Sequence, residues 1–329
     1  MPLIRRITDR IASALLDKLE PRMLDRLTPQ LLDRLAPQLL ERFGDQNWKK
    51  NLFVPSVDVY RVGENEPFMA YSTCSSRDFF HPEFKRIFDS FHFSPFFFHR
   101  KYWEWVFVYH HVAKLLSEGK RGLGFGVGAT EPLSAAFARS GARIVATDAP
   151  EEIGIGSGWA SGGEFVRDIA QIRHEGIVDR ETLGDRVAFR ECDMNSIPED
   201  LRDFDFCWSS CCLEHLGTLQ KGIDFIINSV ERTLRVGGIA CHTTELNLSS
   251  NDATVEAGLT VLYRRRDVEQ LIEELTARGH SVEEFKIAPD SLAIDGYVDT
   301  PPFGPPVHLK LDLHSYTCTS AGLVIRRGR

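Results

Sequence analysis

Residues 121–131, with the sequence RGLGFGVGATE, decide the fold, because a short apolar strand pattern leads directly into a glycine-rich turn. A second apolar run, 142–147, ends at Asp148. Alternating glycines let the backbone turn sharply and let a ligand lie against bare main chain. A carboxylate about 20 residues further on can accept hydrogen bonds from both hydroxyls of a ribose. The pattern predicts a strand, a glycine loop, a helix and a strand, which form the front half of a nucleotide-type binding crevice.

The glycine loop alone leaves the ligand class open, because a dehydrogenase uses the same parts. The strict dinucleotide spacing G-x-G-x-x-G fails, since Ala129 holds the last position counted from Gly124. The relaxed form, with alanine in last place, still passes. An NAD-dependent oxidoreductase therefore stays among the alternatives until the downstream sequence is considered.

Further strand patterns and motifs follow the glycine loop in a fixed order. They are the alternating run 186–192, which delivers Asp193; the run 204–209, which leads into SCCLEHLG at 210–217; the turn LRVGG at 234–238; and the apolar run 239–244. Helical spacing over 98–116 and 266–278, and late strand patterns over 281–288, 307–313 and 319–326, complete the chain.

In this order the motifs resemble the class I S-adenosylmethionine-dependent methyltransferases, over about residues 120–327. The resemblance implies an α/β fold with a Rossmann-like, seven-stranded, mostly parallel sheet and an antiparallel C-terminal edge hairpin. It also implies S-adenosyl-L-methionine as the cofactor. The residues that would bind this cofactor are Gly124, Phe125, Gly126, Gly128, Glu131, Asp148, Trp159, Asp193 and Met194.

Individual roles follow from the same resemblance. The glycines would face the methionine and ribose portion, Asp148 the ribose hydroxyls and Asp193 the adenine amino group. The family often has an acidic residue at the position of Gly122, and this chain does not. Glu131 is a substitute partner for the ammonium group of the cofactor, or a carboxylate that favours a helix N-terminus. Trp159 either stacks on adenine or serves in packing.

For catalysis we expect His215 to act as the general base, because the loop after the fourth strand opens at the carboxyl edge of the sheet. The alternative is that the Glu-His pair only braces this loop. His242 and Glu245, at the end of the fifth strand, are further candidates. A surplus of His and carboxylate favours an oxygen acceptor, and the segments 99–101, 242–245 and 299–302 resemble bacterial glycan-associated methyltransferases.

Two other functions remain open at this point. A catalytically silent scaffold or interaction protein could retain the same fold, and an N-methyltransferase would use the same cofactor. We expect a small-molecule or glycan acceptor.

Composition limits the class of protein. With 329 residues and 43% apolar residues, the chain is long enough for a sizeable core. A net charge of -8 argues against a nucleic-acid partner, which requires a basic face. Seven cysteines, an odd number with no C-x-x-C spacing, predict reduced thiols and no metal site. No signal peptide or membrane-spanning run is evident, so we expect a cytoplasmic protein.

Three regions are expected along the chain. Residues 1–44 form an amphipathic helical arm, in which 21–44 repeat an eight-residue unit that begins with proline. This arm could form a homo-oligomer, lie peripherally on a membrane or pack on its own domain. Residues 45–118 form an aromatic-rich helical cap, with nine Phe between positions 79 and 98 that should mostly be core. Residues 119–329 form the cofactor-binding domain.

Overall fold

The computed structural model describes residues 66–156, 165–174, 176–304 and 306–329, and these residues belong to one compact unit that begins at residue 54. The amphipathic arm, the early part of the expected cap and Trp159 lie outside the described residues. In the described part, no helix has both the length and the apolar character needed to cross a bilayer.

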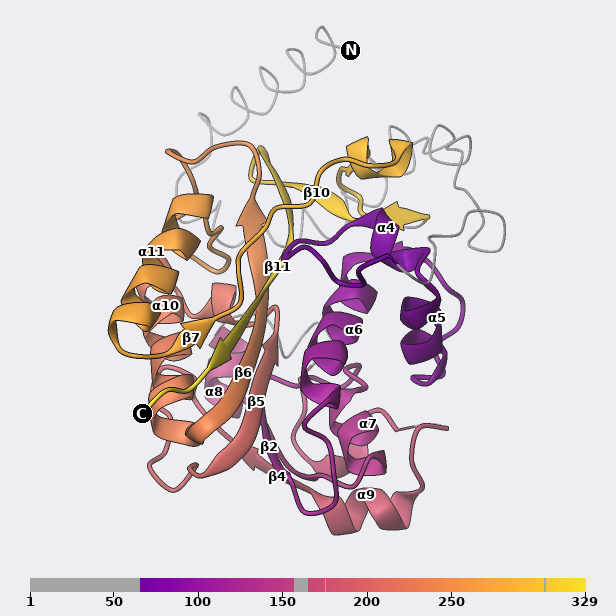
Figure 1. Cartoon of the computed structure of the whole chain (residues 1–329), viewed down its shortest axis with the longest axis vertical. Helices are drawn as coiled ribbons and strands as arrows, with labels where there is room; N and C mark the ends of the chain where they lie inside the picture. Colours follow the sequence, from indigo (N-terminus) through magenta and orange to yellow (C-terminus); the bar gives the residue numbers. More distant parts are fainter. Residues whose placement is uncertain (1–65, 157–164, 175, 305) are drawn as a thin grey trace, which may run out of the picture. The chain divides into compact units, whose positions relative to one another are not determined.

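A mixed sheet forms the centre of the unit, with strand order β4-β3-β2-β5-β6-β11-β10-β8 (Figure 1). Pairing from β4 through β6 is parallel, whereas β11 runs antiparallel to both β6 and β10. The strands are β2 (Arg121–Phe125), β3 (Arg143–Asp148), β4 (Val187–Glu191), β5 (Phe204–Ser210), β6 (Leu234–Asn247), β7 (Ser281–Val282), β8 (Val298–Asp299), β10 (Lys310–Leu313) and β11 (Tyr316–Arg326). The predicted α/β class and antiparallel edge hairpin are confirmed. The described sheet has nine strands where seven were expected, because the short β7 and β8 also pair with it.

Helices cover both faces of the sheet (Figure 1). On one side lie α10 (Leu219–Asn228) and α11 (Arg265–Ala277), and on the other lie α6 (Arg100–Ala113) and α7 (Leu133–Arg139). Shorter helices are α4 (Ser76–Phe79), α5 (Pro82–Asp89), α8 (Glu151–Gly156) and α9 (Arg180–Arg186), and a short second sheet joins β1 (Phe98–His99) to β9 (Val307–His308). Parallel strands with helices on both faces define a doubly wound α/β protein.

Capping residues fix where the two long helices begin. The Thr218 side chain accepts a hydrogen bond from the backbone N–H of Lys221 at 3.2 Å and so starts α10. His99 Nδ1 accepts from the backbone N–H of Lys101 at 3.1 Å at the start of α6. The two helices lie on opposite faces of the sheet (Figure 1).

Aromatic rings on β5 fill the space above two glycines of β2. In the parallel register, Gly122 lies opposite Phe206 and Gly124 lies opposite Trp208. A Cβ at Gly122 would lie 2.4 Å from the Phe206 ring, and one at Gly124 would lie 2.4 Å from the Trp208 ring. The glycines of the strand are therefore packing positions, and the Phe206 ring leaves no room for a side chain at Gly122.

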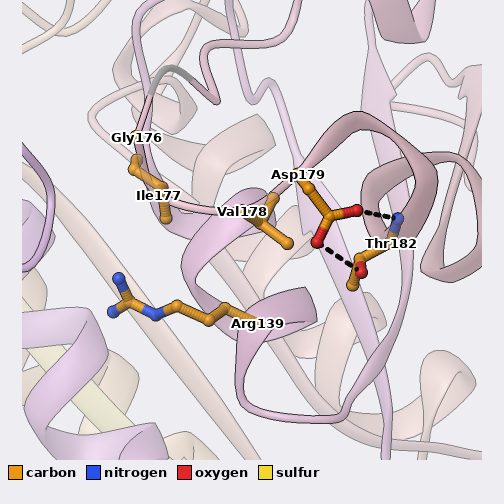
Figure 2. A pocket seen from close by; sticks show the side chains of 6 residues that line it. All are labelled: Arg139, Gly176, Ile177, Val178, Asp179 and Thr182. Atoms are coloured by element: carbon orange, nitrogen blue, oxygen red, sulfur yellow. Dashed lines mark hydrogen bonds between the residues drawn. The ribbon is translucent and has the colours of Figure 1, made fainter.

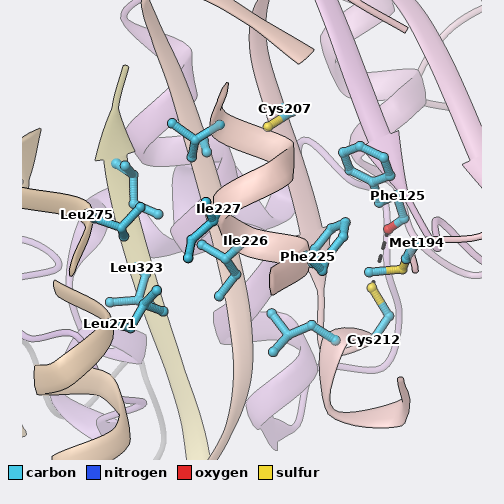
Figure 3. Packing of buried hydrophobic residues seen from close by; sticks show 14 of the residues in the cluster. Phe125, Met194, Cys207, Cys212, Phe225, Ile226, Ile227, Leu271, Leu275 and Leu323 are labelled. Atoms are coloured by element: carbon cyan, nitrogen blue, oxygen red, sulfur yellow. Dashed lines mark hydrogen bonds between the residues drawn. The ribbon is translucent and has the colours of Figure 1, made fainter. Parts of the chain in front are cut away.

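The core under α10 and α11 is a continuous apolar cluster (Figure 3). Phe125 packs edge-on against Phe225 of α10, with ring centroids 5.0 Å apart, and both side chains are buried. Leu271 and Leu275 of α11 and Leu323 of β11 extend the same cluster. Burial of the apolar side chains of this cluster is the main source of stability for the sheet and its helices.

Residues 66–118 pack as part of the same unit and do not form a separate cap. Helix α6 lies on β5, β6 and β11, where the ring of Phe107 occupies the space above Gly322. Most of the aromatic residues of this region are core as expected, including Phe79, Phe84, Phe91 and Trp103. The expected boundary at residue 119 therefore separates two parts of one folded unit.

The strand expected over 281–288 is present only as β7, because another part of the chain takes its place beside β11. Ser72 donates its backbone N–H to Lys286 O at 2.7 Å, and Gly322 donates to Ser72 O at 2.7 Å. Cys74 N donates to Ser320 O at 2.9 Å. Residues 72–74 are thus inserted between β11 and the segment that follows β7.

Candidate functional site

A cavity opens at the carboxyl ends of β2, β3, β4 and β5, where the strand order reverses. This is the position at which doubly wound sheets bind ligands, because loops on the two sides diverge there. The residues that line this candidate cavity are Gly126, Gly128, Asp148, Ala149, Ile153, Phe165, Met194, Cys212, His215 and Leu216.

The glycine loop supplies bare backbone to the cavity. Gly126 and Gly128 have φ values of +58° and +60°, which residues with a Cβ rarely adopt. A Cβ at Gly126 would also lie 2.9 Å from Cys212 Sγ. Any side chain here would therefore enter space that the opposite wall already occupies.

Asp148 ends β3 at the rim of the same cavity. Its Oδ1 accepts a hydrogen bond from the backbone N–H of Ala149 at 2.8 Å, and its Oδ2 accepts one from Val166 N at 3.1 Å. Partial burial raises the pKa of the carboxyl above its ordinary value, against these hydrogen bonds. The two backbone donors fix the carboxylate, and its remaining lone pairs can accept from a ligand hydroxyl.

Apolar side chains form the rest of the wall. Ile153, Phe165, Met194 and Leu216 come from four different segments, and Ile153 is 42% exposed. An apolar wall beside a fixed carboxylate suits a flat heterocycle attached to a ribose.

His215 lies in the cavity wall, in a short 3-10 helix (Leu213–His215) that follows β5. Its Nδ1 is 2.8 Å from Leu259 O, which acts only as an acceptor, so this contact favours the tautomer with a proton on Nδ1. Nε2 lies 3.8 Å from Glu214 Oε1. The Nδ1 contact therefore orients the ring in the cavity wall, with Nε2 on the side of Glu214.

Behind the cavity, five charged residues form an ion cluster between α6, the loop after β5, and β6: Arg100, Lys101, Glu104, Glu214 and Glu245. Arg100 pairs with Glu104 at 3.0 Å and with Glu245 at 2.6 Å, and Lys101 pairs with Glu104 at 3.1 Å. Burial would raise the pKa of Glu104, but Lys101 and Arg100 lower it to about 2. Burial raises the pKa of both Glu214 and Glu245.

His242 is not in the cavity wall, and its expected role as a base is not supported. The ring is 1% exposed between β6 and α10, with Ser209 Oγ 2.8 Å from Nδ1 and Ser229 Oγ 2.9 Å from Nε2. Burial lowers the pKa of the imidazole to about 3. Period-two alternation puts His242 and Glu245 on opposite faces of β6, so only Glu245 joins the ion cluster.

Gly124 and Phe125, two of the expected cofactor-binding residues, are not among the lining residues of the cavity. Gly124 O accepts a hydrogen bond from Thr147 Oγ1 at 2.8 Å, while the Phe125 ring lies in the cluster under α10. Asp193 Oδ1 accepts from Asn195 N at 2.9 Å in the loop after β4, but Asp193 is not among the lining residues.

Glu131 lies beside the glycine loop, buried against β5. Trp208 Nε1 donates to its Oε1 at 2.7 Å, whereas Oε2 is buried and has no hydrogen-bond partner among the described residues. Burial raises the pKa of this carboxyl to about 8. The residue precedes α7, and the carboxylate binds an indole instead of capping the helix.

Sequence reasoning missed the apolar part of the wall: Ala149, Ile153, Phe165, Cys212 and Leu216. Polar groups and glycines stand out in a sequence, whereas most of the lining of a ligand cavity is apolar. Ile153 comes a few residues after Asp148, and Leu216 comes directly after His215. This proximity in sequence was a signal that both residues belong to the cavity wall.

A second hollow lies where α7 ends and α9 begins, at the amino ends of the strands (Figure 2). Its one carboxylate, Asp179, is fully used in capping α9, because it accepts from Thr182 N at 2.7 Å and from Thr182 Oγ1 at 2.8 Å. The hollow brings no uncommitted titratable pair together, so the candidate site is the cavity at the carboxyl edge.

Fold and cavity together define a Rossmann-like, doubly wound α/β protein with a cavity at the carboxyl edge of its sheet. No family model matches the sequence, and no curated protein matches it significantly.

Among solved structures, the chain is similar to the [4+2]-cyclase SpnF, with 22% identity over 54% of this chain and 57% of that chain and a TM-score of 0.36. It is similar to a putative sarcosine dimethylglycine methyltransferase from Galdieria sulphuraria, with 15% identity, coverage of 68% and 84%, and a TM-score of 0.41. It is also similar to the 1,6-didemethyltoxoflavin-N1-methyltransferase of Burkholderia thailandensis, with 17% identity, coverage of 69% of this chain and 77% of that chain, and a TM-score of 0.36. The chain spans less than two thirds of the cyclase. These distant likenesses do not assign a function.

Proposed function

We propose that this protein is an S-adenosylmethionine-dependent methyltransferase that methylates a hydroxyl group of a sugar or glycan. The observation that supports the proposal is the cavity in which the backbone of Gly126 and Gly128, the carboxylate of Asp148 and an apolar wall face one common space. A ribose fits the carboxylate, a purine fits the apolar wall, and a chain of small polar groups fits the bare loop.

Glu131 is proposed to bind the ammonium group of the methyl donor. Its second oxygen lacks a partner among the described residues, and a buried carboxylate oxygen favours a cationic donor. The side chain reaches this place from beyond the glycine loop, since Phe206 excludes a side chain at Gly122. Asp193 and Trp159 remain proposed contacts of the adenine.

When bound, S-adenosylmethionine supplies an electrophilic methyl group on a sulfonium. Alignment of two reactants in one cavity can contribute about 7 to 11 kcal/mol, whereas a general base contributes roughly 3 to 5 kcal/mol. The glycine loop and Asp148 therefore supply the larger effect by positioning. His215 is proposed to accept the proton of the acceptor hydroxyl at Nε2.

Isothermal titration calorimetry with S-adenosylmethionine and S-adenosylhomocysteine tests the cofactor assignment. We expect binding by the wild type and a loss of roughly 1.5 to 3 kcal/mol in binding free energy for Asp148→Asn, because the buried charged hydrogen bonds to the ribose weaken. Asp179→Asn, at the second hollow, is the matched control and should bind normally. No binding by the wild type favours the silent scaffold, and binding of NAD instead favours an oxidoreductase.

Methyl transfer from labelled donor to a panel of nucleotide sugars, glycans and amines tests the acceptor. Turnover of an amine with no sugar or glycan product would contradict the hydroxyl assignment and favour an N-methyltransferase. For His215→Gln we expect kcat to fall by roughly 10² to 10⁴ with methyl transfer still detectable, since positioning is retained.

The region before the described residues is proposed to be an oligomerisation arm. The proline-led repeat of residues 21–44 presents an apolar face with nearly balanced charge, which suits a second copy of the arm better than an anionic membrane. Peripheral membrane contact is the alternative outcome, and a cytoplasmic location is part of the same proposal.

A further inference from the structure

The ion cluster behind the cavity contains more negative than positive charge. Arg100 and Lys101 face three carboxylates, those of Glu104, Glu214 and Glu245. Glu104 uses both cations and also accepts from Ser210 Oγ at 3.1 Å and from Ser320 Oγ at 2.5 Å. Glu214 and Glu245 are therefore the carboxylates whose charge is least compensated.

Each of these two carboxylates has one satisfied and one unsatisfied oxygen. Glu214 Oε2 accepts from Thr244 Oγ1 at 3.0 Å, and Glu245 Oε1 pairs with Arg100. Glu214 Oε1 and Glu245 Oε2 are buried without a hydrogen-bond partner among the described residues. The residues are 0% and 4% exposed, so water does not replace the missing partner at low cost.

A thiol completes the group. Sγ of Cys211, one carboxylate oxygen of Glu214 and one of Glu245 all lie within 4.8 Å of one another. Ligands bound to one zinc ion at about 2.0 to 2.3 Å stand roughly 3.3 to 3.8 Å apart, so small side-chain shifts suffice. Cys211 is held with φ of +48°, and its N–H donates to Thr243 O at 3.1 Å. A conformation that is costly for a residue with a Cβ fixes the direction in which the Cα–Cβ bond of this residue leaves the backbone.

We propose that Cys211, Glu214 and Glu245 bind a divalent zinc-class metal ion that fixes the loop after β5 against β6. One sulfur and two oxygens are ligands that zinc accepts, and thiolate disfavours magnesium and calcium. A divalent ion that displaces the thiol proton also balances the charge of the cluster. Cys212 and His215 of the same loop line the cavity, so the ion would order one wall of the site.

This site was not predicted from the sequence, because Cys211 and Glu214 lie near each other but Glu245 comes from the next strand. A single proton shared by the two glutamates is the competing occupant, since it also removes the excess charge. The two occupants differ in one measurable respect, which is whether the purified folded protein retains a metal.

The test uses the full chain, purified from cultures supplemented with zinc or with cobalt and then desalted. We expect about one zinc per chain by elemental analysis, and for the cobalt form an intense near-ultraviolet band from thiolate-to-cobalt charge transfer. Folded wild-type protein without retained metal and without this band would overturn the proposal. Neither measurement depends on methyl transfer, so the result is independent of the proposed function.

Variants assign the ligands. Cys211→Ser should lose the charge-transfer band, and Cys211→Ser and Glu245→Gln should each weaken zinc binding by roughly 100-fold or more. Cys207→Ser is the matched control, because Cys207 is equally buried on β5 but faces Ser229, and it should keep metal and band. Circular dichroism confirms that each variant is folded. A band that persists in folded Cys211→Ser contradicts the assignment.

Discussion

Gly126 shows how one residue can be constrained both by its backbone and by its neighbours. Its φ of +58° disfavours a side chain, and Cys212 occupies the space in which a Cβ would lie. The positive φ is a constraint on the loop alone. The contact with Cys212 is a constraint on the distance between two walls of the cavity. A substitution therefore has a conformational cost and a cost to the shape of the site.

Gly126→Ala should lower the free energy of unfolding by roughly 1 to 3 kcal/mol and abolish detectable donor binding. Urea unfolding and calorimetry with S-adenosylhomocysteine measure the two effects. Gly237→Ala is the control, because Gly237 has φ of +81° with nothing within 4 Å of a Cβ. It should cost roughly 1 kcal/mol and leave binding unchanged. Equal binding by both variants would contradict the role of Gly126.

His242 should make the protein less stable as the pH falls. Its pKa is about 3 in the folded protein, against about 6.5 in an unfolded chain. Between these two pKa values the unfolded chain binds a proton that the folded chain does not. The contribution of His242 to the free energy of unfolding is therefore full above pH 6.5 and decreases as the pH falls toward 3. The expected loss from pH 7 to pH 5 is about 2 kcal/mol.

Urea unfolding of wild type and His242→Gln at pH 7, 6 and 5 checks this linkage. The variant should be less stable at pH 7, because glutamine cannot reproduce both serine contacts, but its stability should change less with pH. Parallel pH profiles for the two proteins would show that His242 is not the titrating group.

Single residues of the site were predictable where the backbone dictates them. Gly126, Gly128 and Asp148 follow from a strand, a turn and a strand, and all three line the cavity. His242 was not predictable, because a one-residue difference in strand register decides whether a side chain faces the core or the other face. The environment of Glu131 was not predictable either, because its hydrogen-bond partner Trp208 is distant in sequence.

At the scale of elements, β2 and β5 are coupled by glycine opposite aromatic residues. The two glycines leave β2 without side chains on one face. The aromatic rings of β5 cover that face, so the two strands pack as a pair. This pairing leaves no room for a side chain at Gly122.

Gly122→Asp should therefore destabilise the protein. Its Cβ would lie 2.4 Å from the Phe206 ring and 2.8 Å from the Ile144 side chain, and a buried carboxylate would follow. We expect a loss of roughly 3 kcal/mol or more, measured by thermal or urea unfolding. Gly296→Asp, at an exposed position with open space, is the control. A variant as stable as the control would contradict the packing role.

Elements with strong periodicity were predicted closely, whereas those that depend on distant partners were not. The helix expected over 98–116 is α6, and the strand expected over 204–209 is β5. The strand expected over 281–288 ends after Val282, because residues 72–74 compete for the same edge of β11. The local sequence pattern indicates that a segment can form a strand. It does not indicate which of two segments pairs with a given sheet edge.

On the scale of the whole molecule, the unit that contains the described residues begins at residue 54 and holds the cavity, the ion cluster and the core. Deletion of residues 1–53 should leave the melting temperature and donor affinity of this unit unchanged. Analytical ultracentrifugation should show a lower association state for the shortened chain. Loss of vesicle binding without a change in mass would favour membrane contact by the arm, and loss of donor binding would show that the unit depends on it.

Residues 72–74 lie between β11 and the segment after β7, so one portion of the chain is held by another that is made much later. During synthesis on a ribosome, this portion has no partner until the C-terminal strand has emerged. Contacts of such large sequence separation slow folding, because a long loop must close before they form. We therefore expect nascent chains that stop before Tyr316 to leave Ser72 and Cys74 accessible to proteases and chaperones, although the glycine loop and β5 are already complete.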